Sequence, residues 1–112
     1  MTGVVVCRLA DIADGESGSF VVTRPGGERI GVLAVRRGAQ IHAYVNSCPH
    51  TGAPLDFQAG RFLTLDKSLI QCSTHGALFR IDDGYCLKGP CAGKSLLPVT
   101  VAVANETVYL AE

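Results

Sequence analysis

The sequence has no excess charge of either sign and no long hydrophobic run. Its ten Lys and Arg residues balance ten Asp and Glu residues, and the basic ones are scattered except for Arg36 and Arg37. This pattern excludes a basic nucleic-acid-binding stripe and a polybasic membrane patch. The first stretch, MTGVVVCRLADIADG, has only three valines in a row and no basic residue before them, so we expect no signal peptide. With no apolar run near the length of a membrane span, the sequence predicts a cytoplasmic protein.

Common catalytic signatures are also missing. The sequence contains no serine nucleophile elbow, no phosphate-binding loop and no paired-carboxylate arrangement. Asp82 and Asp83 are adjacent, but Gly84 follows them, and this order predicts a turn. A chain of 112 residues can form one domain with a modest core, so we expect a single domain over residues 1–112.

What the chain does contain is a series of short β-type segments separated by glycine and proline. In IHAYVN the apolar side chains alternate with His42 and Tyr44, which is the period of a strand. No window longer than about ten residues keeps a helical apolar period. We therefore expect an all-β fold of short antiparallel strands, with a closing hairpin around Asn105. The expected strands lie within residues 19–24, 28–37, 41–46, 68–73, 77–82, 96–105 and 106–111.

Two of the three histidines lie beside cysteines in similar surroundings. NSCPHTGAPLDF contains Cys48 and His50, and IQCSTHGALF contains Cys72 and His75. Each pair follows a strand-like segment and is followed by glycine, so each lies in a short loop. A soft thiolate and a borderline imidazole from each of two loops would hold a metal centre between them. Two alternatives remain open at this point, namely ordinary buried residues and one tetrahedral zinc ion with a Cys2His2 ligand set.

The segments CPHTGAPL and CSTHGALFRIDDG resemble the cluster-binding loops of Rieske [2Fe–2S] proteins, especially the small soluble Rieske ferredoxins. KGPCAG, residues 88–93, resembles the proline loop that covers the cluster in that family. The resemblance implies a Rieske-like fold of stacked antiparallel sheets with a small cluster-binding subdomain, about residues 46–83, formed by two loops. The 21 residues between His50 and Cys72 exceed the usual spacing in ferredoxin members. We expect residues 58–67 to be an extended connection there.

The same resemblance implies a ligand set for one [2Fe–2S] cluster per chain. Cys48 and Cys72 would bind one iron through thiolates, and His50 and His75 would bind the other through neutral imidazoles. Replacing two anionic thiolates by imidazoles makes an added electron less costly, so the potential lies above that of an all-cysteine plant-type cluster.

The resemblance also implies a function. The protein would be a one-electron carrier that takes electrons from a flavin- or iron–sulfur-containing reductase and passes them to a terminal oxygenase or another acceptor. It would be the electron-transfer component of an oxidoreductase system and not itself an enzyme, because it is too small for a substrate pocket and a second catalytic metal beside the cluster. Two alternatives are a small subunit of a multi-subunit reductase, of the nitrite reductase small-subunit type, and a zinc-stabilised interaction module.

The remaining cysteines are expected to have structural roles. Cys7 lies in VVVCRL, which predicts a buried strand thiol. Cys86 and Cys91 are interpreted as two reduced thiols, with a disulfide as the alternative, and not as iron ligands. His42 is expected to be a structural or surface residue.

Two further positions bear on the reduction potential. In high-potential Rieske proteins a serine and a tyrosine hydroxyl donate hydrogen bonds to cluster sulfurs, and such bonds raise the potential. Aligning on CSTHG places Ala77 and Phe79 at these positions, and neither side chain has a hydroxyl. The resemblance therefore implies a potential at the low end of the Rieske range.

Overall fold

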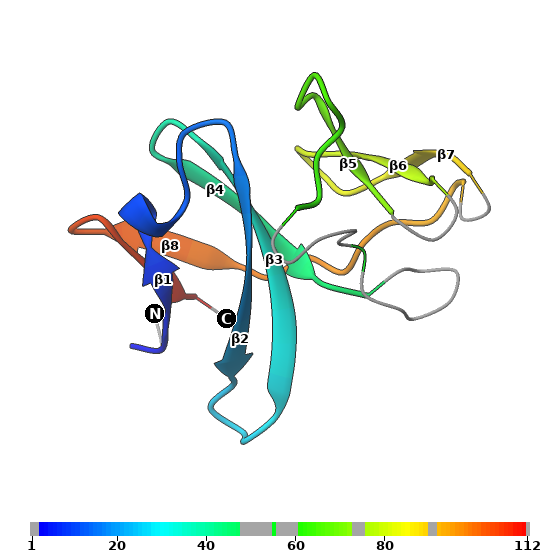
Figure 1. Cartoon of the computed structure of the whole chain (residues 1–112). Helices are drawn as coiled ribbons and strands as arrows, with labels where there is room; N and C mark the ends of the chain where they lie inside the picture. Colours follow the sequence, from blue (N-terminus) through cyan, green and yellow to red (C-terminus); the bar gives the residue numbers. More distant parts are fainter. Residues whose placement is uncertain (1–2, 48–54, 56–60, 73–75, 90–91, 112) are drawn as a thin grey trace.

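The computed structural model describes residues 3–47, 55, 61–72, 76–89 and 92–111. These residues form three antiparallel three-stranded sheets, with the orders β1-β9-β8, β2-β3-β4 and β5-β6-β7 (Figure 1). The elements are β1 (Val5–Arg8), the 3₁₀ helix η1 (Leu9–Asp11), β2 (Ser17–Thr23), β3 (Arg29–Arg37), β4 (Gln40–Val45), β5 (Leu69–Gln71), β6 (Leu78–Arg80), β7 (Cys86–Lys88), β8 (Val101–Ala104) and β9 (Thr107–Leu110). The all-β prediction is confirmed.

Local turns build the hairpins that the sequence predicts. β2 and β3 pair in register from Ser17 opposite Val35 to the end of β2, and the PGG turn joins them. β8 and β9 are joined through Asn105 and Glu106, whose φ angles are 51° and 60°. Positive φ at both central residues matches the right-handed twist of the flanking strands. The predicted hairpin around Asn105 is therefore confirmed.

In the central sheet, β2-β3-β4, the middle strand β3 is buried on both faces. Alternate residues of β3 belong to different cores: Val32 and Ala34 face one core, and Leu33 and Val35 face the other. The first, here called the terminal-strand core, packs against β1-β9-β8, and Figure 1 shows that sheet on one side of the central strands. The second, called the ligand-loop core, packs toward β5-β6-β7. Its members are Leu33, Val35, Tyr44, Leu55, Phe62, Ile70, Cys72, Ala77, Phe79, Ile81, Cys86 and Leu96.

The segment after β7 ties the β5-β6-β7 sheet to the central sheet. The Leu96 N–H donates a hydrogen bond to the Gly84 carbonyl at 2.9 Å, which holds the segment beside the turn before β7. One residue later, the Leu97 carbonyl accepts a hydrogen bond from the Val45 N–H at 2.8 Å, at the end of β4. Leu96 therefore bonds to the turn before β7, and Leu97 bonds to the end of β4. Together these two hydrogen bonds link the β5-β6-β7 sheet to the central sheet.

The described part of the connection between the two predicted ligand loops, residues 61–68, folds back as a hairpin onto β5. Leu63 forms an antiparallel bridge with Ile70, and it packs, partly buried, against the ligand-loop core. An ion pair joins Lys67 at the turn to Glu16, just before β2. The extra length between the loops is therefore used, in its described part, to add a β-bridge beside β5.

Candidate metal centre

Cys72 is the one member of the predicted ligand set that lies among the described residues. Cys48, His50 and His75 lie outside them. Within the described part of the chain, no group of three His, Cys, Asp or Glu side chains could hold a metal ion. No competing metal site is thus formed there, and the four-residue ligand set stays a prediction.

Cys72 follows the end of β5 and begins a closed loop. Its N–H donates a hydrogen bond to the Ala77 carbonyl at 2.8 Å, and its own carbonyl accepts one from the Gly76 N–H at 3.0 Å. The two ends of the loop that contains Cys72 and His75 in the sequence are therefore fastened to each other. The Cys72 residue is 0% exposed.

The surroundings of Cys72 are apolar. Its neighbours in the ligand-loop core include Phe62, Ile70 and Phe79, all fully buried. Among the described residues, no charged side chain is buried. A thiolate is a soft ligand for iron, and here it would act in a rigid, low-dielectric setting. The Cys72 position fits a ligand of a buried iron–sulfur cluster.

The other predicted loop is anchored at the described residues on its two sides. Asn46 follows β4, and its N–H donates to the Gly31 carbonyl at 2.8 Å. The Asn46 side-chain carbonyl accepts a hydrogen bond from the Leu55 N–H at 2.8 Å. Leu55 is fully buried in the ligand-loop core. A hydrogen bond thus joins Asn46 to Leu55, and Cys48 and His50 lie between these two residues in the sequence. Sequence reasoning missed this role of Asn46.

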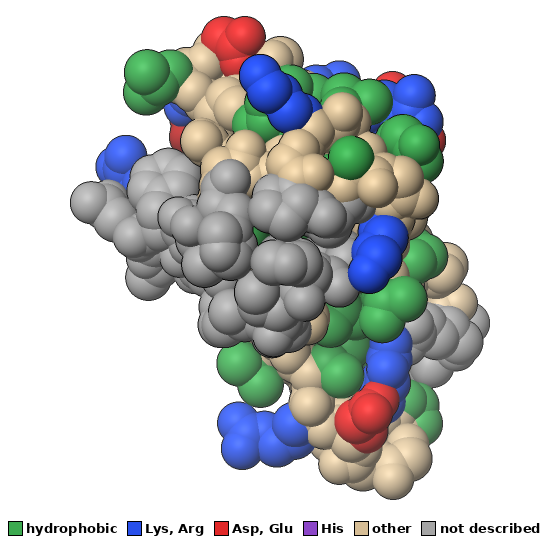
Figure 2. All heavy atoms as spheres, turned by 90° about the vertical axis from the view of Figure 1, so that its right-hand side faces the viewer, with side chains coloured by type: hydrophobic (Ala, Val, Ile, Leu, Met, Phe, Trp, Pro, Cys, Tyr) green, Lys and Arg blue, Asp and Glu red, His purple; other side chains and the backbone are tan. Residues whose placement is uncertain are grey.

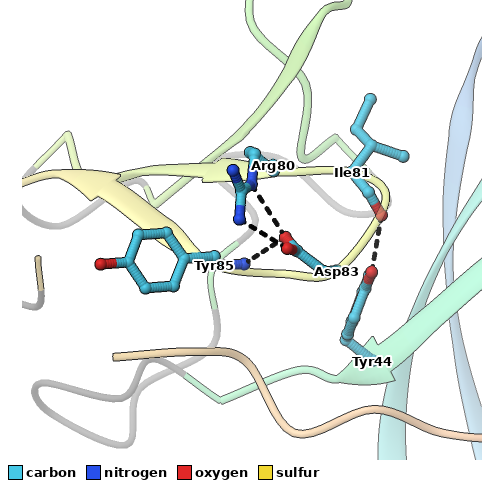
Figure 3. Close-up of polar contacts among 5 residues, drawn as sticks. All are labelled: Tyr44, Arg80, Ile81, Asp83 and Tyr85. Atoms are coloured by element: carbon cyan, nitrogen blue, oxygen red, sulfur yellow. Dashed lines mark hydrogen bonds and ion pairs between the residues drawn. The ribbon is translucent and has the colours of Figure 1, made fainter. Parts of the chain in front are cut away.

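A hydrogen-bonded cluster at the β6–β7 turn joins the β5-β6-β7 sheet to the central sheet (Figure 3). The Tyr44 hydroxyl, on β4, donates a hydrogen bond to the Ile81 carbonyl at 2.6 Å. Burial raises the pKa of Tyr44 to about 12, and the carboxylates of Asp83 and Asp82 add to the effect. The phenol therefore stays protonated and keeps its hydrogen bond over the physiological pH range.

The same turn carries an ion pair on its exposed side. The Arg80 guanidinium donates two hydrogen bonds to the Asp83 carboxylate, at 2.6 and 3.1 Å, and it holds the pKa of that carboxyl below its usual range. The Arg80 guanidinium also lies over the Tyr85 ring, 5.0 Å from its centre. The predicted turn at Asp82 and Asp83 is confirmed, with Asp83 accepting a further hydrogen bond from the Tyr85 N–H at 3.0 Å.

The other cysteines are placed in part. Cys7 is buried on β1, as predicted, and burial followed by the nearby Asp11 carboxylate raises its pKa to about 11. Cys86 is buried on β7 within the ligand-loop core, with its Sγ 3.3 Å from the Lys88 carbonyl oxygen. Cys91 lies outside the described residues, so the interpretation of Cys86 and Cys91 as reduced thiols stays a prediction.

A family model described as the Rieske [2Fe-2S] domain matches residues 2–105. The chain therefore belongs to the Rieske [2Fe–2S] domain family, and its cofactor is a [2Fe–2S] cluster. Membership of this family, together with the cysteine and histidine residues in the two loop sequences, favours an iron–sulfur cluster over the zinc site that the spacing alone left open. Among the described residues, the single helix, η1, has three residues, so no helix there is long enough to cross a membrane.

Three comparisons define the likeness further. The chain is 26% identical to the ferredoxin of carbazole 1,9a-dioxygenase from Nocardioides aromaticivorans IC177, with a TM-score of 0.77, covering 99% of this chain and 98% of that one. It is 30% identical to a chain in a complex of reduced oxygenase and oxidized ferredoxin in carbazole 1,9a-dioxygenase, with a TM-score of 0.72, covering 96% of this chain and 90% of that one. It is 31% identical over 105 residues to human apoptosis-inducing factor 3, covering 94% of this chain but only 16% of that protein.

Proposed function

We propose that the protein is a one-electron carrier that passes electrons from a reductase to a terminal oxygenase. The observation that carries this proposal is the likeness to the ferredoxin of carbazole 1,9a-dioxygenase, which extends over 98% of that ferredoxin. The chain thus contains the counterpart of a whole ferredoxin, whereas it spans about one sixth of the human relative's length. The proposal assigns the protein the role of an electron-transfer component, which acts in the cytoplasm.

We also propose that Cys48, His50, Cys72 and His75 are the complete ligand set of the cluster, within a single domain over residues 1–112. When bound, a [2Fe–2S] cluster accepts and returns one electron. The protein's own contribution is to bind and shield it. The hydrogen bonds that close the Cys72 loop, and the Asn46–Leu55 bond beside the other loop, support two rigid loops of this kind.

Exposed apolar and basic side chains on β7 and on the segment after it suit docking through short-range contacts. Leu87 and Leu97 are 47% and 66% exposed, and Lys88 and Lys94 are exposed beside them in the sequence. Figure 2 shows hydrophobic and basic side chains interleaved on the face that it presents. Because the formal net charge is zero, recognition of a redox partner would depend on such short-range contacts and not on long-range steering.

The ligand set is tested by replacing each of the four residues in turn by Ala and measuring iron, sulfide and the visible spectrum. Wild type should hold about two irons and two sulfides per chain. Each variant should lose the native spectrum, because one iron is left with an open coordination position. Cys7→Ala is the matched control, since Cys7 is a buried cysteine in the terminal-strand core. A Cys72→Ala protein with an unchanged spectrum and full iron content would show that the assignment is wrong.

The carrier role needs its own test. The reduced protein is mixed with the oxygenase encoded nearest to its own gene, and its reoxidation is followed together with product formation. Electron transfer coupled to product is expected. Reoxidation by a reductase complex, with no oxygenase able to accept the electron, would instead support the reductase-subunit alternative.

A further inference from the structure

Gly89, the residue after β7, lies in direct backbone contact with the end of the second ligand loop. Its φ angle is +109°. A Cβ built on Gly89 would lie 2.7 Å from the Ala77 Cα and 2.9 Å from the Ala77 Cβ. Atoms of a packed interior do not approach each other this closely, so any larger residue at position 89 would force the two segments apart.

Ala77 is the residue on which the Cys72 loop closes. Its carbonyl accepts the hydrogen bond from the Cys72 N–H at 2.8 Å, and the residue is 1% exposed. A displacement of the Ala77 backbone therefore moves the acceptor that holds Cys72. Gly89 packs against this same residue, Ala77.

The segment that begins at Gly89 is itself held against β7. The Gly89 carbonyl accepts a hydrogen bond from the Ala92 N–H at 3.1 Å, and the Gly93 N–H donates to the Cys86 carbonyl at 3.2 Å. The Cys86 N–H in turn donates to the Lys94 carbonyl at 2.8 Å. These hydrogen bonds hold the segment against β7. A larger side chain at position 89 would therefore displace Ala77, because the segment cannot simply move away.

We propose that Gly89 is a positioning residue for the cluster: its lack of a side chain lets its backbone pack directly on Ala77, whose carbonyl holds the Cys72 N–H. The inference rests on the proposed ligand set, because it needs Cys72 to be an iron ligand. Opening the contact should disturb the geometry at the thiolate-bound iron and let water and chelators reach the cluster.

The chain offers a matched control in Gly27, in the turn between β2 and β3. Its φ angle is +94°, so Gly27→Ala meets the same kind of backbone strain as Gly89→Ala. A Cβ at Gly27 would meet nothing within 4 Å, so only the substitution at Gly89 adds a steric collision. The difference between these two variants isolates the contact from the cost of positive φ.

The experiment compares wild type, Gly89→Ala and Gly27→Ala as holoproteins. Three quantities are measured: the rate of cluster bleaching by an iron chelator, the g values of the reduced protein in EPR, and the midpoint potential by protein-film voltammetry. Gly89→Ala should bleach at least about tenfold faster than wild type, the factor that a modest overpacking strain produces, and should show shifted g values and a shifted potential. Gly27→Ala should match wild type in all three.

Equal values for Gly89→Ala and Gly27→Ala would overturn the proposal. If Gly89→Ala does not fold, Ala77→Gly provides the second test, since it removes the Ala77 Cβ from the contact while Gly89 stays in place. Faster bleaching with shifted g values is then expected, and unchanged values would overturn the proposal. A wild-type protein that holds no iron–sulfur cluster would instead refute the proposed ligand set, so the two failures are distinguishable.

Discussion

Replacing Tyr44 by Phe should measure how firmly the sheet beside the ligand loops is held to the central sheet. The Tyr44 hydroxyl donates to the Ile81 carbonyl at 2.6 Å, and the two residues are only 3% and 2% exposed. The substitution keeps the ring, which packs so closely against Gly84 that a Cβ there would lie 2.8 Å from the Tyr44 Cε1 atom. It therefore removes the hydrogen bond with little loss of packing.

The size of the effect follows from the buried carbonyl. Without the hydroxyl, the Ile81 carbonyl loses a donor that water cannot readily replace at a site that is 2% exposed. Such a loss costs about 1–3 kcal/mol of unfolding free energy. For a chain of 112 residues, this lowers the Tm by roughly 4–15 °C.

The pH dependence gives an independent signature. The folded-state pKa of Tyr44 is about 12, raised by burial above an ordinary value near 10. A raised pKa favours the protonated phenol, so its contribution is fully present below about pH 10 and is lost as the pH rises toward 12. The shift corresponds to about 2–3 kcal/mol between these pH values. Tyr44→Phe should lack this part of the alkaline loss of stability.

Urea unfolding from pH 7 to 11 provides the assay, with Tyr109→Phe as the control. Tyr109 lies on β9 and is partly buried, and its hydroxyl makes no hydrogen bond to a described residue. We expect Tyr44→Phe to be less stable than Tyr109→Phe at pH 7 and the gap to narrow above pH 10. Equal stability of the two variants across this range would refute the reasoning.

Two further predictions concern the cluster. The wild-type midpoint should lie near the low end of the Rieske range, roughly −150 mV rather than +300 mV, and Phe79→Tyr should raise it; voltammetry near neutral pH giving a wild-type value above about +100 mV would contradict this. Replacing Cys86 and Cys91 together by Ser should leave iron at about two per chain by metal analysis, since ligation is complete without them. Half that iron or less, in a protein with wild-type circular dichroism, would make one of them a ligand.

Most of the fold could be predicted because its strands carry local signals. The β2–β3 and β8–β9 hairpins have turn residues with alternating apolar segments on both sides. The strand β7 was missed for a different reason. β7 has three residues, Cys86–Lys88, followed by Gly89 and Pro90, so it is too short to show a period. It becomes a strand because it pairs with β6, and that pairing is a tertiary contact.

The apolar alternation correctly predicted β4 as a strand, but it did not show that both faces of the strand contain buried residues. A strand with apolar residues on one face predicts one buried side, yet Ala43 and Tyr44 are both buried because cores lie on both sides of the central sheet. The supporting residues of the site were missed for a similar reason. Asn46 and Gly89 act through contacts with residues distant in the chain, and the spacing of a motif carries no signal for such contacts.

The setting of Cys72 also explains why this fold would favour a low potential. Reduction adds negative charge to a cluster, and burial in an apolar environment makes that charge more costly. The core around Cys72 is apolar, and the residues at the two hydroxyl positions, Ala77 and Phe79, are 1% and 0% exposed. The nearby Arg80 does not offset this, because its guanidinium is paired with Asp83 on the exposed side of the turn. With Cys72 as an iron ligand, as proposed, this apolar packing would withhold stabilisation from the reduced state. The reduced protein would then be a ready electron donor, which suits the proposed transfer to an oxygenase.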